Sequence, residues 1–254
     1  MKKGLKFLAC LSILVMAFSF TRLSHSDFRE QLGLVALWTF DKGTIQNNEV
    51  SDIFAKNNGT ITGKPKETQG NDGIALKFDG VVDCVKIIND IFFESISMEA
   101  VIRPVLGARA PIYDKYNHGI QLLDSGQVGI WIRAEQADTA KQWVSAYIAY
   151  PNDGLWHHVV GVAEDKKNIR IYLDGILKST ALAPDPISVA YASSVKPSIA
   201  YTQHLNGIWY KGDIDEVAVY KSALGDTDVK KLYTTALAIE SKARLTAMWG
   251  EIKR

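Results

Sequence analysis

Short apolar runs separated by turn residues dominate the chain between residues 34 and 220. In these runs apolar and polar positions alternate, or a few apolar residues follow one another, which is typical of β-strands. Asp174-Gly175, between two such runs, indicates a tight hairpin because Gly readily takes a positive φ. The pattern predicts strands at Leu34–Phe40, Ala75–Phe78, Cys84–Ile88, Ser97–Arg103, Gly119–Leu123, Gln127–Ala134, Val144–Tyr150, Trp156–Ala163, Ile169–Leu173, Ser198–Thr202 and Asp215–Tyr220.

One segment, Asp226–Leu237, has the spacing of a helix. Acidic residues occupy its first turn, and Val229, Leu232 and Tyr233 would share a face. Many short strands with one terminal helix predict an all-β fold, an antiparallel β-sandwich or jelly roll with a short C-terminal helix. No long linker interrupts residues 27–235, so we expect one domain there.

The N-terminal segment is predicted to be a signal peptide over residues 1–26. A basic start, MKKGLK, precedes an apolar run at residues 7–20, and Ser24 and Ser26 offer a cleavage site before Asp27. The run is short for a bilayer span, so we expect a secreted or periplasmic protein with no stable membrane span after cleavage. An uncleaved anchor is the alternative, because Thr21-Arg22-Leu23 is an unusual approach to a cleavage site.

Loss of residues 1–26 would change both the charge and the cysteine content. It removes four of the 29 basic residues and none of the 28 acidic ones, which leaves a net charge near −3. This balance gives no electrostatic basis for binding nucleic acid. Cys10 would leave with the signal, so Cys84 could form no intramolecular disulfide and is predicted to be a small buried residue.

The adjacent histidines His157 and His158 lie between Trp156 and an apolar run. Consecutive side chains of a strand point to opposite faces, whereas histidines in zinc sites converge. We therefore predict a structural role for the pair within a strand, rather than a metal site.

Five segments together carry a resemblance to a known family: LWTFDKG, GIALKFDG, SISMEAVIRP, DGLWHHVVGVAEDKKNIRIYLDG and GDIDEVAVYKSALGDTDVKKLY. In this order they resemble the bacterial LamG-like jelly-roll domains of the concanavalin A-like lectin/glucanase superfamily, over about residues 34–235. The resemblance implies an extracellular module that binds glycans or other cell-surface ligands, often with calcium. It also implies that neither histidine is catalytic.

Enzymes of this superfamily that retain configuration need two carboxylates about 5–5.5 Å apart. The acidic spacing that would place them on one strand is missing, and the nearest cluster is Asp213-Ile214-Asp215-Glu216. No nucleophile elbow, phosphate loop or metalloprotease helix occurs either. A non-catalytic binding module is favoured. A glycan hydrolase or lyase, and an envelope scaffold that binds another protein, are the alternatives.

Aromatic side chains on a sheet surface could stack on sugar rings. Along Gln127–Ala134, Trp131 and Arg133 point away from the apolar face, so we predict that they are exposed and contact carbohydrate, helped by Trp209. Trp38 and Trp156 belong to strand motifs and are predicted to be core residues. The sequence does not identify the ligand or the oligomeric state.

The family resemblance also implies a structural Ca²⁺ site that joins the first and last strands. Carried over by position, its ligands are Asp41, the carbonyl of Gly80 and Asp215, with Asp213 as a further acid. Lys42 follows Asp41 where an acid is common, which reduces the expected affinity. The other interpretation assigns these acids to turns and solvent.

Residues 236–254 form a C-terminal tail beyond the domain. If this tail is helical, Leu245, Met248, Trp249 and Ile252 share one face, and we expect that face to dock on the domain or on a partner. A disordered tail is the alternative.

Overall fold

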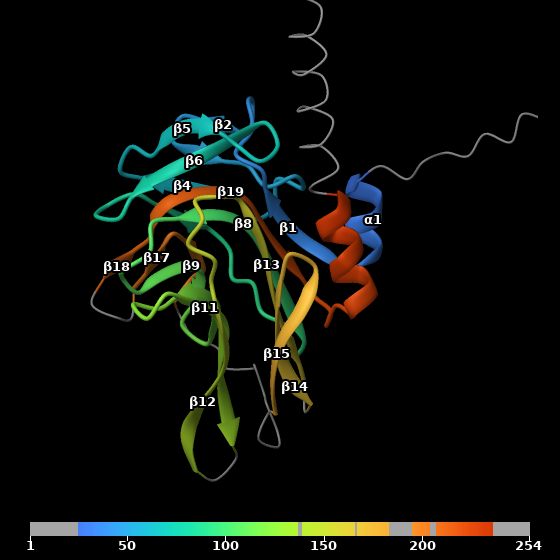
Figure 1. Ribbon diagram of the computed structural model, residues 1–254. Helices are drawn as coiled ribbons and strands as arrows, with labels where there is room; N and C mark the ends of the chain where they lie inside the picture. Colours follow the sequence, from blue (N-terminus) through green and yellow to red (C-terminus); the bar gives the residue numbers. More distant parts are fainter. Residues whose placement is uncertain (1–24, 137–138, 166, 183–194, 204–206, 236–254) are drawn as a thin grey trace, which may run out of the picture.

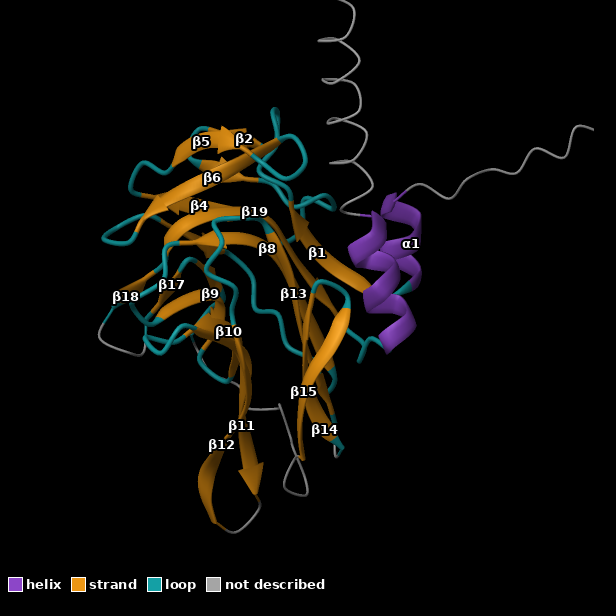
Figure 2. Cartoon of the chain, viewed as in Figure 1, coloured by secondary structure: helices purple, strands orange, loops and turns teal. Residues whose placement is uncertain are grey.

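The computed structural model describes residues 25–136, 139–165, 167–182, 195–203 and 207–235 (Figure 1). The strands form two large antiparallel sheets and a two-stranded ribbon, which confirms the predicted all-β sandwich of the jelly-roll type (Figure 2). Most of the predicted signal peptide, residues 1–24, and the whole tail, residues 236–254, lie outside the described residues.

The eight-stranded sheet contains both the first and the last long strand. Its order is β15 (Ile176–Leu182), β14 (Asn168–Leu173), β13 (His157–Glu164), β8 (Ile96–Pro104), β19 (Lys211–Tyr220), β6 (Ile74–Asp79) and β5 (Lys66–Gln69), and β1 (Leu34–Trp38) also pairs with β19. Leu34 lies opposite Tyr220 and Trp38 opposite Val217. The chain therefore closes on itself through backbone hydrogen bonds between β1 and β19.

The nine-stranded sheet is built largely from consecutive hairpins. Its order is β12 (Thr139–Ala149), β11 (Gln127–Gln136), β10 (His118–Leu122), β9 (Ala110–Lys115), β16 (Ser198–Ile199), β7 (Cys84–Ile87), β4 (Gly59–Thr62), β3 (Glu49–Val50) and β2 (Ile45–Gln46). The ribbon pairs β17 (Tyr201–Thr202) with β18 (Ile208–Trp209). The single strand predicted at Ser198–Thr202 is broken at Ala200, whose φ is +64°.

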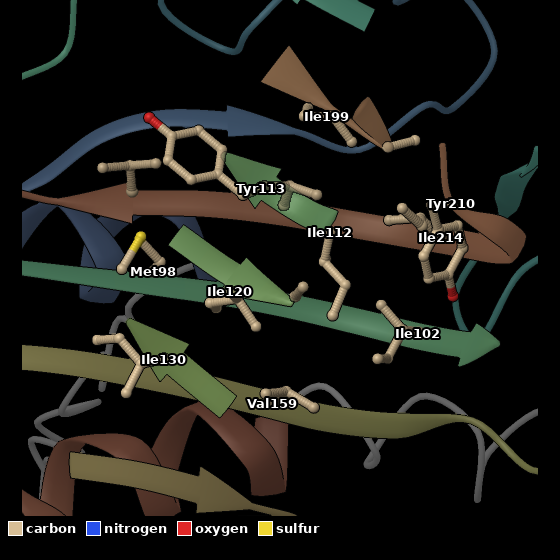
Figure 3. Packing of buried hydrophobic residues seen from close by; sticks show 14 of the residues in the cluster. Met98, Ile102, Ile112, Tyr113, Ile120, Ile130, Val159, Ile199, Tyr210 and Ile214 are labelled. Atoms are coloured by element: carbon tan, nitrogen blue, oxygen red, sulfur yellow. The ribbon is translucent and has the colours of Figure 1, made fainter. Parts of the chain in front are cut away.

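The main core lies between the two sheets. Met98, Ile102 and Val159 project from the eight-stranded sheet toward side chains such as Ile120 and Ile130 of the nine-stranded sheet, and all five are fully buried (Figure 3). Burying an aliphatic side chain of this size stabilises a fold by about 1.5–3 kcal/mol. Along β11 the predicted apolar face, Val128, Ile130 and Ile132, lies in this layer, as expected.

Two predicted buried residues have different outcomes in the structure. Trp38 is fully buried, as expected. Trp156 is not a core residue: it precedes β13, is half-buried, and lies under the Arg103 guanidinium at 4.7 Å from the ring centroid. Cys84 is buried and burial raises the pKa of its thiol, in agreement with a packing role.

A second apolar layer covers the outer face of the eight-stranded sheet. Two helices lie on that face: α1 (His25–Gln31), which the sequence pattern did not predict, and the predicted C-terminal helix, described over residues 226–235 (Figure 2). The buried residues of this layer are Phe28, Leu34, Leu37, Val160, Val162, Tyr172, Ala218, Tyr220, Leu224, Val229 and Leu232. Neither helix, within the part of the chain that the structure describes, has the length and apolar character to cross a bilayer.

The two adjacent histidines point to opposite faces of β13. His158 lies 2.8 Å from Glu99 through Nε2, whereas His157 contacts Asp174 at 2.8 Å through Nδ1. Burial alone would lower the pKa of His157, but hydrogen bonds to Asp174 and Asp153 raise it. As predicted, the pair lies within a strand and its two rings point to opposite faces.

Glu99 is the centre of a buried charge network beneath the helices. Arg29 of α1 is fully buried and pairs with Glu99 at 3.1 Å and with Glu216 at 2.6 Å. Burial alone would raise the pKa of Glu99, but the charge of Arg29 and hydrogen bonds from His158 and Tyr220 lower it to about 2. Glu99 is therefore an ionised structural group.

Candidate functional site

One row of side chains crosses the outer face of the nine-stranded sheet. Directly opposed residues on neighbouring strands point to the same face, so the register defines the row as Ser145, Trp131, Gly119, Asp114, Ser198 and Lys86. The flanking residues Ile130 and Ile132 are in the core, which places the row on the opposite surface. Trp131 and Lys86 are four strands apart, or about 19 Å along the sheet.

Trp131 lies on this face but is not exposed, and the prediction of an exposed Trp131 is wrong. Only 4% of the residue is accessible, and its ring centroid lies 5.0 Å from that of Trp143 on β12. Gly119 allows this placement, since a Cβ there would lie 3.1 Å from Trp131 Nε1. Trp143 is 54% exposed and forms the outer surface of the pair.

Arg133 extends the same surface. Its guanidinium carbon lies 4.8 Å from the ring centroid of Tyr116 and 5.6 Å from that of Trp143, within the range of cation–π contact. Tyr116, Trp131, Arg133 and Trp143 thus form a continuous group, here called the aromatic patch. Flat apolar rings beside a guanidinium can stack on the C–H face of a sugar and donate hydrogen bonds to its hydroxyl groups.

Trp209 belongs to a separate group at the other end of the row. It packs against Tyr201 with ring centroids 5.2 Å apart, and Lys86 Nζ lies 5.8 Å from the Tyr201 ring. A small hollow of about 190 Å³ is lined here by Lys86, Ser198 and Tyr201, among others. Of the predicted carbohydrate-binding residues, the structure brings Trp131 and Arg133 together and leaves Trp209 at a distance along the same face.

Sequence reasoning missed Trp143 and Tyr201, and considered Tyr116 as one of several loop aromatics without selecting it. The alternation Trp143-x-Ser145-x-Tyr147 was an available signal, but the predicted strand began one residue later, at Val144. The signal shows only that Trp143 and Tyr147 share a face. Their alignment with Trp131 depends on the pairing of β11 with β12.

Carboxylates gather at the seam between β1 and β19. Asp41 follows β1, Asp215 lies in β19, and both hold the loop between β5 and β6. Asp41 Oδ1 accepts a hydrogen bond from Ile74 N at 3.0 Å, and Asp215 Oδ2 accepts one from Asp72 N at 2.8 Å. Gly73 has a φ of +64°, and a Cβ there would collide with Asp41 Oδ1.

Asp215 is the most perturbed of these acids. Burial, with the negative charges of Glu216 and Asp41, raises its pKa to about 8, although the backbone N–H groups of Asp72 and Asn71 oppose the shift. Burial and the same two charges also raise the pKa of Asp72. Among the described residues, Asp215 Oδ1 has no hydrogen-bond partner.

This cluster contains only part of the predicted calcium ligand set. Asp41 and Asp215 both hydrogen-bond to the β5–β6 loop, and Asp72 of that loop lies beside them, a residue that the sequence had not indicated as part of the site. Asp213 instead pairs with Arg103 at 2.8 Å, and Gly80 lies against Lys211. No three acidic, His or Cys side chains in the described ranges are arranged as a metal site, so a cation here would also need backbone carbonyl ligands.

Comparison with known proteins gives a family and a set of similar folds. The family model described as the Concanavalin A-like lectin/glucanases superfamily matches residues 93–230, more than half of the chain. No match to a curated protein sequence was found.

Three solved structures illustrate the likeness of fold. Domain 4 of AbnA, a GH43 extracellular arabinanase from Geobacillus stearothermophilus solved with arabinotriose, is 20% identical, with 79% of this chain and 98% of that domain covered and a TM-score of 0.61. The binding domain of Paraclostridial Mosquitocidal Protein 1 is 12% identical, with coverage of 80% and 52% and a TM-score of 0.61. A structure of botulinum neurotoxin type C, whose cell entry depends on two ganglioside molecules, is 14% identical, with coverage of 84% and 53% and a TM-score of 0.61. The chain spans about half the length of the two toxin structures.

Proposed function

Because the chain belongs to the Concanavalin A-like lectin/glucanases superfamily, we propose that it is a non-catalytic module that binds carbohydrate on the outer face of its nine-stranded sheet. The aromatic patch is the observation that carries this proposal. Trp143 offers an exposed ring, Trp131 supports it from below, and Arg133 lies beside it as a hydrogen-bond donor. The similar AbnA domain was solved with arabinotriose, which supports an oligosaccharide as the ligand class.

The length of the row suits an extended ligand. The aromatic patch and the hollow beside Lys86 and Tyr201 are about 19 Å apart, as estimated from the strand spacing. Between them lie Gly119, Asp114 and Ser198, which are buried, and the last two hydrogen-bond to Thr202 and Tyr201, so an extended ligand would pass over this stretch and not bind to it. A chain of a few sugar units could contact both ends.

Replacement of Trp143 by Ala tests the proposal directly. A glycan array, with arabino-oligosaccharides included, would identify ligands, and titration calorimetry would measure their affinity. We expect Trp143→Ala to lower affinity about tenfold or more, because an exposed aromatic anchor carries a large share of binding energy. A hydrolysis screen of the same glycans tests the enzymatic alternative.

Trp156→Ala is the matched control, since Trp156 is a half-buried tryptophan that directly precedes β13 of the other sheet. This variant should bind glycans as the wild type does. Equal affinities of the wild type and Trp143→Ala, or glycan cleavage by the purified chain, would contradict the proposal.

We further propose that Ca²⁺ binds at the β1–β19 seam, with the carboxylates of Asp41 and Asp215 and backbone carbonyl groups of the β5–β6 loop as ligands. The buried Asp215 oxygen without a hydrogen-bond partner in the described part of the chain fits a cation, as does the hard oxygen character of the group. A cation there would relieve the repulsion among these acids and fasten the first strand to the last. We also propose that the chain is exported, and this proposal rests on its N-terminal sequence alone.

A further inference from the structure

A groove of about 660 Å³ lies on the eight-stranded sheet, away from the aromatic patch. It is formed by the β4–β5 loop, the turn between β6 and β7, and the start of β19, all at the end of the molecule opposite the free end of the β11–β12 hairpin (Figure 1). Four exposed lysines line it: Lys64, Lys66, Lys77 and Lys211. None of the four forms an ion pair within the described ranges.

The positions of these lysines concentrate positive charge. Lys66 and Lys77 are directly opposed on β5 and β6, an arrangement that is destabilising for like charges. The two acids of the groove are engaged by backbone N–H groups: Asp83 accepts from Lys64 N at 2.7 Å, and Asp79 accepts from Val81 N at 2.8 Å. The groove therefore favours an anionic ligand.

Exposed aliphatic residues stand at its rim. Val81 and Val82, on the β6–β7 turn, are 68% and 45% exposed, and Val105, after β8, is 53% exposed. The N–H groups of residues 81, 82 and 83 all donate to Asp79 Oδ1. Because these donors are already satisfied by the Asp79 carboxylate, the valine side chains could reach the acyl boundary while the charged Asp79 stays among the lipid headgroups.

We propose that this end of the molecule docks on an anionic lipid bilayer. The lysines would pair with lipid phosphates while Val81, Val82 and Val105 enter the boundary of the acyl chains, as in other interfacial proteins. A soluble acidic polysaccharide would use the same lysines, but it would leave the three valines without a role. No aromatic side chain other than the buried Phe78 lines the groove, which also distinguishes it from the aromatic patch.

Vesicle co-sedimentation of the full chain tests the lysines. Vesicles of phosphatidylcholine with and without phosphatidylglycerol give the contribution of anionic lipid, and the N-terminal segment is common to all variants. Each Lys→Gln substitution should lower the phosphatidylglycerol-dependent affinity for vesicles about fivefold. The fourfold variant, with all four lysines replaced, should lower it several hundredfold. The matched control replaces the exposed Lys56, Lys178, Lys221 and Lys230 by Gln and should keep most of the binding.

A polarity-sensitive dye tests the valines. It would be attached to Val82→Cys in a Cys10→Ser background, where the remaining Cys84 is buried. We expect a blue shift with phosphatidylglycerol vesicles and none for the dye on Leu155→Cys, an exposed site elsewhere. Trp143→Ala should behave as the wild type, so this result is independent of the glycan proposal.

Three outcomes would overturn the proposal. They are equal binding of the fourfold variant and its control, no dye shift at position 82, or lysine-dependent binding of dextran sulfate or inorganic phosphate without vesicle binding. The last outcome would assign the groove to soluble anions.

Discussion

Trp131 and Trp143 are neighbours, but the first is buried and the second is exposed. Replacing Trp131 should therefore affect mainly the stability of the fold, and replacing Trp143 mainly the binding of a ligand. Trp131 is 4% exposed beneath a ring that is 54% exposed. Trp131→Ala should therefore remove a buried aromatic and lower the free energy of unfolding by about 3–5 kcal/mol. Chemical denaturation would measure this loss, which the sequence-based prediction of an exposed Trp131 had not included.

Trp143→Ala is the control for that measurement. Because half of its surface already faces solvent, we expect its free energy of unfolding to fall by about 1 kcal/mol or less. A result in which both variants lose the same stability would mean that Trp143 is as integral to the fold as Trp131. The same result would also weaken the assignment of Trp143 as a surface on which a ligand stacks.

Alternation along one strand can assign a face but not an exposure. It placed Trp131 and Arg133 together, away from Ile130, and the structure agrees. Burial of Trp131 depends on a side chain from β12, and nothing in the local sequence fixes the register between β11 and β12. The position of Asp72 beside Asp215 could not be predicted from the sequence for the same reason, since the two residues are 143 positions apart in the chain.

At the scale of elements, α1 is the feature that the sequence pattern missed. The helix has seven residues and its first two, His25 and Ser26, fall within the segment expected to be removed, so its apolar positions were too few to indicate a helix. Its structural importance comes from Arg29, whose acidic partners lie 70 and 187 residues away. Several polar strands, among them β5 with the sequence KETQ at the sheet edge, also lacked an apolar pattern.

Arg29→Met should reveal this dependence. The substitution leaves Glu99 without its cation in a buried site, and breaking a buried pair in this way costs about 3–5 kcal/mol. The effect should appear as a lower melting temperature at neutral pH. The difference between the two melting temperatures should shrink as the pH falls toward 2. In the wild type, the ionised Glu99 contributes its full stabilisation above the usual carboxyl pKa, and this stabilisation is lost as the pH falls through its folded-state pKa of about 2.

Arg109→Met is the matched control, because Arg109 is exposed and forms no ion pair in the described part of the chain. Arg29→Met combined with Glu99→Gln should recover part of the loss by removing the orphaned charge. If the double variant is no more stable than Arg29→Met, the helix is held by its apolar contacts and not by the ion pair.

For the whole molecule, the acidic seam predicts a calcium response that depends on pH. The folded-state pKa of Asp215 is about 8, well above the usual value near 3.9. Without a cation the folded state therefore holds a proton that the unfolded state releases, and this group makes the fold less stable as pH rises from about 4 to 8. Calcium requires the ionised carboxylate, so its stabilising effect should grow over the same range.

Melting curves at pH 5.5 and pH 8, with calcium or with a chelator, would measure this response. At a hundredfold excess over the dissociation constant, calcium should add about 2.7 kcal/mol. Asp215→Asn should be more stable than the wild type in chelator at pH 8, by about 1 kcal/mol or more, and should not respond to calcium. Asp213→Asn, whose partner is Arg103, should keep the response. Identical wild-type curves at pH 8 would exclude the site.

The central place of β19 has a consequence for the order of folding. This strand lies between β8 and β6 and also pairs with β1, yet it begins at residue 211. A growing polypeptide cannot complete the eight-stranded sheet until its last strand has been synthesised, and pairing between such distant segments is intrinsically slow. The nascent chain would thus stay extensible through most of its synthesis, a state compatible with threading through a narrow translocation pore.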